Sequence, residues 1–203
     1  MKALLLAALL AITPFVHAVT GSGTIKTEAR AVSGFQAVAT RGSVALVLRQ
    51  GTREGLELRG DDNVLALIET RVVERGGVPT LEIGTKDGAS YSTRNPVVAT
   101  IDLITLRALT LAGASDVSAD ALKAPALQIV VSGSGKLRLR GLAVDELAVT
   151  VSGSGDAVLA GRAPTLGLKL SGSADVNARE LESDTVAASV AGSGNVTVNA
   201  RKT

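Results

Sequence analysis

Apolar and polar residues alternate along short runs throughout the second half of the chain. One set of runs has an aliphatic residue at every second position, at Leu109 and Leu111; Leu127, Ile129 and Val131; Leu147, Val149 and Val151; Leu166, Leu168 and Leu170; and Val186 and Val190. A second, shorter set follows at Val117 and Ala119; Leu137 and Leu139; Ala157 and Leu159; Val176 and Ala178; and Val196 and Val198. A period of two residues predicts β-strands with one buried face.

Tetrads of small residues separate the two sets of runs. They are Ala112-Gly113-Ala114-Ser115, Ser132-Gly133-Ser134-Gly135, Ser152-Gly153-Ser154-Gly155, Ser171-Gly172-Ser173-Ala174 and Ala191-Gly192-Ser193-Gly194. The tetrads begin 20, 20, 19 and 20 residues apart. A repeat of two or three short strands cannot bury its apolar face alone, so it must stack on its neighbours. The sequence therefore predicts an all-β fold, a parallel β-helix or β-solenoid with coils of about 20 residues.

The glycines of these tetrads are expected to form structural corners. Tight bends need a positive φ or a close approach of two backbones, and a β-carbon obstructs both. The predicted corner residues are Gly113, Gly133, Gly135, Gly153, Gly155, Gly172, Gly192 and Gly194.

The first half of the chain is β-rich but less regular. Arg41-Gly42-Ser43 resembles a degenerate first tetrad, with alternating apolar residues on both sides. Apolar spacing within 63–73 also allows a short helix, and the Ser-, Asn- and Gly-rich stretch 87–96 is expected to be a loop and the most mobile segment. We expect one domain over 35–203, with an irregular half at 35–105 and regular coils at 106–203.

The first 18 residues have the layout of a signal peptide. Lys2 supplies a positive charge, 3–12 are apolar, and Val16-His17-Ala18 has small residues at alternate positions. The apolar run is too short for a membrane-spanning helix. We therefore expect cleavage after Ala18, an N-terminal extension at 19–34, no transmembrane segment in the mature chain, and export to the periplasm or the medium.

Composition excludes several kinds of chemistry. The chain has no cysteine, and its one histidine, His17, lies in the predicted signal peptide. The mature protein therefore lacks the groups for Ser-His-Asp or Cys-His catalysis and for zinc sites built on His or Cys. Without Lys2 it has 20 basic and 19 acidic residues, and its only aromatic residues are Phe35 and Tyr91. Neither fact favours a nucleic-acid partner, and no cofactor or catalytic residue is predicted.

A column of mostly polar residues follows the tetrads, at Asp116, Lys136, Asp156, Asp175 and Asn195. Asp156 and Asp175 would lie on adjacent coils, near the spacing of a glycosidase carboxylate pair. Short polar side chains also bond the backbone at corners, which is the commoner role. Calcium is a third interpretation, although Lys136 interrupts the ladder and no metal site is predicted. The candidate binding residues are Asp116, Asp156, Asp175, Asn195 and, in the 87–96 loop, Tyr91.

Several segments carry a family likeness. They are Gly34-Phe35-Gln36-Ala37-Val38, Leu56-Glu57-Leu58-Arg59-Gly60-Asp61, Leu81-Glu82-Ile83 and the Ser-Gly-Ser-Gly-(Asp/Asn) repeats. Over about 35–198 the chain resembles the head GIN domain family of putative auto-transporter adhesins. The resemblance implies a right-handed parallel β-helix-like domain in a bacterial envelope or secreted protein, and it brings no catalytic residues. An auto-transporter needs a C-terminal membrane barrel; none follows the last predicted coil, so we expect no self-export by that route.

The sequence thus favours an exported, non-enzymatic, adhesin-like binding module. Its expected partner is an envelope component, a glycan or a protein, and its oligomeric state stays open. One alternative is a carbohydrate-active enzyme that uses Asp156 and Asp175. Another is an envelope structural protein that self-assembles by end-to-end strand addition.

Overall fold

The computed structural model describes residues 18–202, so the predicted signal peptide, apart from Ala18, lies outside the described residues. Its elements are β1 (Val19–Thr20), β2 (Ile25–Arg30), β3 (Ala37–Gly42), β4 (Val44–Gln50), β5 (Gly55–Asp61), α1 (Asp62–Leu65), β6 (Ile68–Arg75), β7 (Val78–Thr85), β8 (Tyr91–Ser92), β9 (Val97–Leu103), β10 (Ala108–Gly113), β11 (Val117–Ala119), β12 (Leu122–Gly133), β13 (Leu137–Gly153), β14 (Ala157–Arg162), β15 (Thr165–Gly172), β16 (Val176–Gly192) and β17 (Val196–Lys202). The all-β prediction is confirmed.

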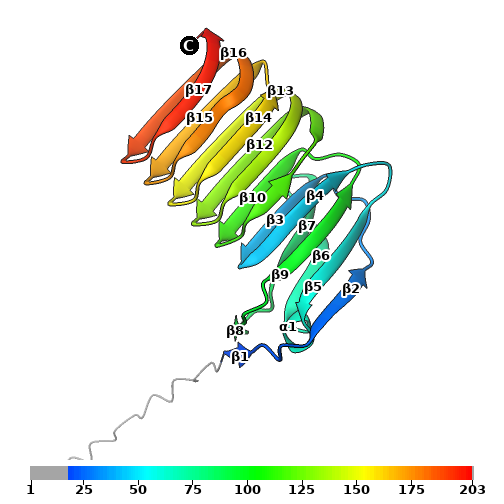
Figure 1. Cartoon of the computed structure of the whole chain (residues 1–203). Helices are drawn as coiled ribbons and strands as arrows, with labels where there is room; N and C mark the ends of the chain where they lie inside the picture. The colour runs from blue at the N-terminus through cyan, green and yellow to red at the C-terminus, as the bar shows by residue number, and fades with distance from the viewer. Residues whose placement is uncertain (1–17, 203) are drawn as a thin grey trace, which may run out of the picture.

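Strands in the second half are parallel and stacked (Figure 1). Leu127 of β12 pairs with Leu147 of β13, and Leu147 pairs with Leu166 of β15. The tetrads share this register, since Gly133 pairs with Gly153 and Gly153 with Gly172. We call each unit of this length, such as 137–156, a rung. The predicted step of about 20 residues is therefore the actual pairing register.

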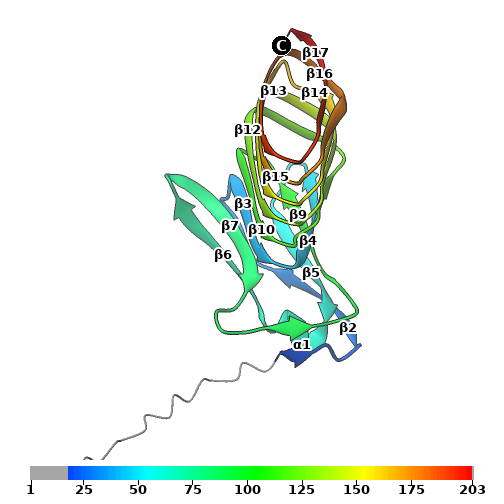
Figure 2. The same cartoon turned by 90° about the vertical axis from the view of Figure 1, so that its left-hand side faces the viewer.

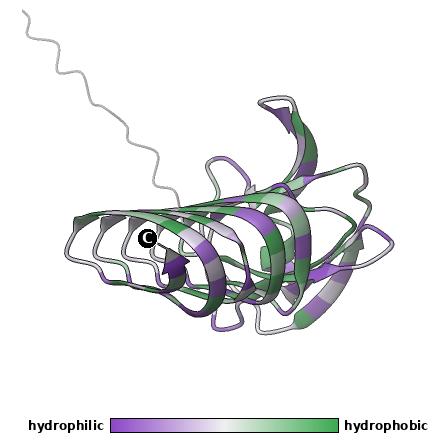
Figure 3. Cartoon of the chain, turned by 90° about the horizontal axis from the view of Figure 1, so that it is seen from above, coloured by the Kyte–Doolittle hydropathy of each residue, from purple (hydrophilic) through white to green (hydrophobic). Residues whose placement is uncertain are grey.

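The predicted apolar positions face the interior of the stack. Leu127, Leu147 and Leu166 are 2%, 2% and 1% exposed. Within 137–156 the buried–exposed alternation breaks at Arg140-Gly141 and at Asp145-Glu146, where two exposed residues follow one another or nearly so. With the glycine corner, these breaks divide the rung into three faces. Viewed from above, the rungs lie one behind another with pale, small-residue corners at the left (Figure 3).

The corner glycines fall into two columns. Five of the predicted residues, joined by Gly42, have positive φ and stack directly: Gly113, Gly133, Gly153, Gly172 and Gly192. The other three, Gly135, Gly155 and Gly194, do not have positive φ. Each instead lies so near the carbonyl oxygen below it that a β-carbon would overlap that oxygen. Both mechanisms that favour glycine at corners are present, one in each column.

The chain order of the first rungs differs from their order in space. Ala37 of β3 pairs with Ala108 of β10 on one side and with Thr80 of β7 on the other. Val44 of β4 likewise pairs with Val97 of β9. The rung made of β7 and β9 therefore lies below the rung made of β3 and β4, although it comes later in the chain. The degenerate tetrad at Gly42 is confirmed as a corner in register with the others.

Antiparallel strands close this end of the stack. β5 pairs with β9, β2 pairs with β5, and β6 pairs with β7. The segment 63–73 is thus mostly strand, and a helix over that range is wrong except for the single turn α1. Alternating charges along β6 fit a strand, and Gly76 and Gly77, with φ of +56° and +78°, form the turn of the β6–β7 hairpin. Figure 2 shows this hairpin leaning away from the stack.

The core continues into the closed end without interruption. Phe35, Leu65 and Ile68 are each at most 1% exposed and pack in the same cluster as the interior of the rungs. No helix within 18–202 has the length and apolar character needed to cross a membrane.

Candidate functional site

The rung made of β7 and β9 has a different corner from all the others. Only Ser43 separates β3 from β4, whereas 86–96 separate β7 from β9. The Lys86 N–H donates to the Leu67 carbonyl at 2.9 Å, and the Ala89 N–H donates to the Lys86 carbonyl at 3.0 Å around Gly88, whose φ is +75°. The loop predicted over 87–96 is present here, with the two-residue strand β8 inside it.

A buried carboxylate anchors the second half of this loop. Asp61 is 1% exposed. Its oxygens accept hydrogen bonds from Thr93 Oγ1 at 2.5 Å and from Asn95 Nδ2 at 2.7 Å. Thr93 Oγ1 in turn accepts the Asn95 N–H at 3.0 Å. The hydrogen bonds from Thr93 and Asn95, aided by the Gly23 N–H, lower the pKa of Asp61 despite its burial.

The N-terminal strand β1 holds the first half of the loop. Val19 pairs with Tyr91 and Thr20 with Ser92 in a short parallel ladder. The Val19 N–H donates to the Ser90 carbonyl, and the Gly21 N–H donates to the Ser92 carbonyl, both at 2.8 Å. The segment predicted to be most mobile is therefore tied to the rest of the fold on both sides of Tyr91.

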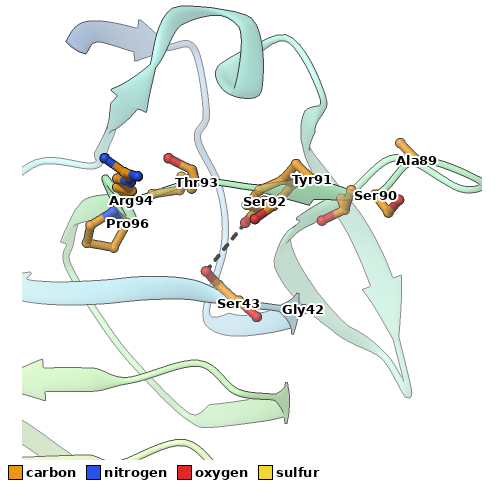
Figure 4. Close-up of a pocket in the computed structure, with 11 residues that line it drawn as sticks. Gly42, Ser43, Ala89, Ser90, Tyr91, Ser92, Thr93, Arg94 and Pro96 are labelled. Atoms are coloured by element: carbon orange, nitrogen blue, oxygen red, sulfur yellow. Dashed lines mark hydrogen bonds between the residues drawn. The ribbon is translucent and has the colours of Figure 1, made fainter. Parts of the chain in front are cut away.

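These contacts leave a cavity of about 570 Å³ beside Tyr91. The lining residues are Gly42, Ser43, Thr85, Ala89, Ser90, Tyr91, Ser92, Thr93, Arg94, Pro96 and Val97. Figure 4 shows Tyr91 over Ser43, with its hydroxyl donating to the Ser43 carbonyl at 3.4 Å. Tyr91 is half-buried, and burial raises the pKa of its hydroxyl, which stays protonated as a donor at neutral pH.

The cavity combines one aromatic ring, several hydroxyl groups and one cation. Phe35 is buried in the core, so Tyr91 is the one aromatic side chain in the described part of the chain that reaches the surface. Ser43, Ser90, Ser92 and Thr93 supply hydroxyls, and Arg94 supplies a guanidinium. The lining contains no carboxylate, imidazole or thiol. Such a surface can bind a polar ligand but lacks groups for acid–base chemistry.

The predicted polar column lies at the glycine corners, away from this cavity. Asp116, Asp156, Asp175 and Asn195 are all exposed. Asp116 Oδ1 accepts the Lys136 N–H at 2.8 Å, and Asp175 Oδ1 accepts the Asn195 N–H at 3.0 Å and Asn195 Nδ2 at 2.9 Å. Each carboxylate thus accepts from the backbone of the next rung. The structure brings these residues together with one another but not with Tyr91.

This geometry bears on the carboxylate-pair and calcium interpretations. Asp156 Oδ1 faces the Asp175 N–H at 3.4 Å, so it points along the column toward the backbone. Among residues 18–202 no three acidic or histidine side chains gather closely enough to hold a metal ion. The observed contacts are those of corner residues that satisfy backbone donors.

A second cavity of about 570 Å³ lies between the β6–β7 hairpin and the outer faces of β3 and β10. Small side chains such as Ala39 and Thr110 line it, together with Arg75 and Glu82. Arg71 Nε donates to Glu82 Oε2 at 2.9 Å, and Arg75 donates to Oε1. Burial opposes ionisation of Glu82, but the two guanidinium groups outweigh it and lower the pKa. The charges here are engaged with each other, and no aromatic residue lines the cavity.

Sequence reasoning singled out Tyr91 but missed the residues around it. Ser43 and Arg94 join the cavity only because the β7–β9 corner stacks on the β3–β4 corner, and that stacking reverses chain order. Asp61 was quoted only as the end of a strand. The dipeptide Asn95-Pro96 was the available signal for a fixed turn.

The family comparison and the structural comparisons agree with this architecture. Residues 34–203 match the family model described as putative auto-transporter adhesin, head GIN domain. A putative adhesin from Bacteroides fragilis NCTC 9343 is 27% identical, with a TM-score of 0.80 over 90% of this chain and 83% of that one. The comparison with curated proteins gave no match.

Two further solved structures share the fold at lower identity. A putative adhesin from Parabacteroides distasonis ATCC 8503 has 18% identity and a TM-score of 0.63, covering 92% of this chain and 96% of that one. A putative lipid binding protein from the same strain has 15% identity and a TM-score of 0.60, covering 90% and 100%. Because the family model spans nearly all described residues, the chain belongs to the head GIN domain family of putative auto-transporter adhesins.

Proposed function

We propose that this chain is an exported β-solenoid binding module, adhesin-like and non-enzymatic, that recognises a glycan at the Tyr91 cavity. The stacked register of about one rung per 20 residues supports the solenoid description. The predicted signal peptide supports export to the periplasm or the medium. The name and title of similar proteins support the adhesin role.

The single observation that carries the glycan proposal is the position of Tyr91. A sugar ring presents an apolar C–H face and a rim of hydroxyls, and protein sites match these with an aromatic ring and convergent polar groups. Tyr91 lies beside a cavity with Ser43, Ser92 and Thr93 around it. The loop is held by Asp61 and β1, so ligand binding need not order it first.

Arg94 narrows the expected ligand. Its guanidinium lines the cavity, and no acidic side chain lies among the lining residues to neutralise it. A glycan with a carboxylate or sulfate group would therefore bind more tightly than a neutral one. The absence of acid–base groups from the lining favours binding over hydrolysis.

The test is a glycan screen of the mature chain, followed by titration of each hit. Tyr91 is the chain's only tyrosine and there is no tryptophan, so intrinsic tyrosine fluorescence reports on this cavity alone. We expect a saturable fluorescence change with acidic glycans and weaker binding for Arg94→Ala. Tyr91→Phe should retain most of the affinity, measured calorimetrically, and Tyr91→Ala should lose it.

Arg53→Ala is the matched control, because Arg53 is 85% exposed and lies outside the cavity. Glycan binding that leaves Tyr91 fluorescence unchanged, or that survives Tyr91→Ala, would place the ligand elsewhere. Hydrolysis of the bound glycan that disappears in the Asp156→Asn, Asp175→Asn double variant would instead establish the enzyme alternative.

A further inference from the structure

The two ends of the stack are protected to different degrees. At the N-terminal end the edge strand β2 carries Lys26, Glu28 and Arg30, and β6 carries alternating Glu and Arg residues. Lys26 and Arg30 form ion pairs with Glu28 at 2.9 and 2.7 Å. Charged residues on edge strands are a common device against pairing with other chains.

The C-terminal end lacks this device. Its last rung consists of 185–192 of β16 and 196–202 of β17. Residues 185–200 contain no charged residue and no proline. Val186 to Gly192 pair with β15 on one side, and within the described chain no strand pairs with them on the other. Their outer ladder groups are therefore free to pair.

The core is also open at this end. Val190 is 47% exposed, whereas Leu170, its partner in the rung below, is 3% exposed. Val196 and Val198 are half-buried, whereas Val176, which pairs with Val196, is 3% exposed. Interior positions of the last rung thus face solvent, and covering them would bury aliphatic surface.

We propose that a second copy of this chain covers this end, so that two molecules associate tail to tail through β16. An edge that carries net charge would repel its own copy, whereas this uncharged edge does not. Antiparallel pairing can place Val186 opposite Val190 of the partner and Ala188 opposite itself. Directly opposed residues point to the same face, so the interior residues of both copies stay inside.

The contrast between the ends sets the form of the assembly. Head-to-tail growth would pair the neutral edge with the charged β2 or β6 edges, and it would continue into a filament. Tail-to-tail pairing uses the same surface on both molecules and closes at two copies. The Tyr91 cavities lie at the far ends, so the dimer would present them in opposite directions. This consequence for ligand binding rests on the proposed function, but the dimer does not.

The first test is the mass of the mature chain in solution, measured by light scattering over a range of concentrations. We expect a dimer that does not grow further. Val190→Lys, an inward charge on the open edge, should shift it to monomer. Val72→Lys is the matched control, because Val72 is 38% exposed on the β6 edge, and it should leave the dimer intact.

A cross-link provides a second readout that does not depend on disrupting the edge. The chain has no cysteine, so Ala188→Cys introduces a single thiol. Opposed Cα atoms in antiparallel strands are about 4.5–5.5 Å apart, within the disulfide range. Oxidation should therefore give a covalent dimer for Ala188→Cys and none for Val72→Cys.

Other outcomes would overturn the proposal. A wild-type chain that stays monomeric at all concentrations, or a dimer lost with Val72→Lys but kept with Val190→Lys, would exclude the tail-to-tail interface. Mass that increases without limit would replace the closed dimer by a filament. A dimer sensitive to Val190→Lys without the Ala188→Cys cross-link would exclude the proposed register.

Discussion

Gly153 stacks directly on Gly133, with so little space between them that a β-carbon on Gly153 would overlap the Gly133 carbonyl oxygen. Gly153 also has a φ of +126°, a conformation that L-residues rarely adopt. The same two constraints recur at each rung of this column. The corner therefore requires glycine for two independent reasons.

We predict that Gly153→Ala destabilises the protein by at least about 1–3 kcal/mol, the usual penalty for such a backbone conformation. Denaturant unfolding measures the change. Gly167→Ala is the matched control, because Gly167 lies in β15 with no positive φ and its β-carbon would meet nothing nearer than 4.0 Å. That variant should be neutral or stabilising by about 0.5–1 kcal/mol. Equal stability of the two variants would contradict the proposed role of the corner.

Thr40 and Ser115 form a buried hydroxyl pair, with their oxygens 2.9 Å apart. Ser115 also donates to the Gly42 carbonyl at 3.2 Å, which leaves Thr40 as the donor between the hydroxyls. Ser115→Ala should cost about 1–3 kcal/mol because it strands the Thr40 hydroxyl. Thr40→Val should cost less, and the double variant should recover most of the loss. Additive changes in the unfolding free energies of this cycle would refute the coupling.

Asp61 predicts an acid-sensitive loop. Its folded pKa is lowered, so ionised Asp61 stabilises the fold above its unfolded pKa of about 3.9, and this contribution is lost as pH falls through the folded pKa. Asp61→Asn should therefore destabilise the protein at about pH 7 and much less at about pH 3. Urea unfolding followed by Tyr91 fluorescence measures both values. Asp87→Asn, at a 95% exposed position, is the control; a penalty for Asp61→Asn that does not depend on pH would argue against an ionised Asp61.

Glu82 predicts a difference between buried and exposed ion pairs. Its side chain is 8% exposed between Arg71 and Arg75, whereas Glu69, 3.9 Å from Arg71, is 43% exposed. Glu82→Gln should cost about 1 kcal/mol or more, because charge-assisted hydrogen bonds are lost in a buried setting. Glu69→Gln should change stability by less than about 0.5 kcal/mol. Thermal melts of both variants provide the comparison, and a larger effect at Glu69 would reverse our interpretation.

The repeat was predictable because each rung carries the same local information. Leu127, Leu147 and Leu166 occupy the same phase of a strict alternation, and that phase alone determines that they are buried. The glycine corners follow from spacing in the same way. The distinction between Gly153, which needs positive φ, and Gly155, which does not, depends on backbone geometry that composition does not carry.

The first half was harder because its contacts are not between successive units. Ala37 has neighbours at Thr80 and Ala108, and no periodicity links these positions. The apolar spacing in 63–73 fits both a helix and a strand, and pairing with β7 decides in favour of the strand. The Tyr91 cavity was only partly predictable for the same reason, since Ser43 and Asp61 reach it through long-range contacts.

The reversed order of the first two rungs separates the molecule into a recognition end and a spacer. The intervals between rung partners after β10 are 19 or 20 residues, so whole repeats could be added or removed there without disturbing Tyr91 or its supports. Each added repeat would extend the reach of the cavity by about 4.8 Å, the distance between neighbouring strands. Length and specificity could therefore vary independently among relatives of this protein.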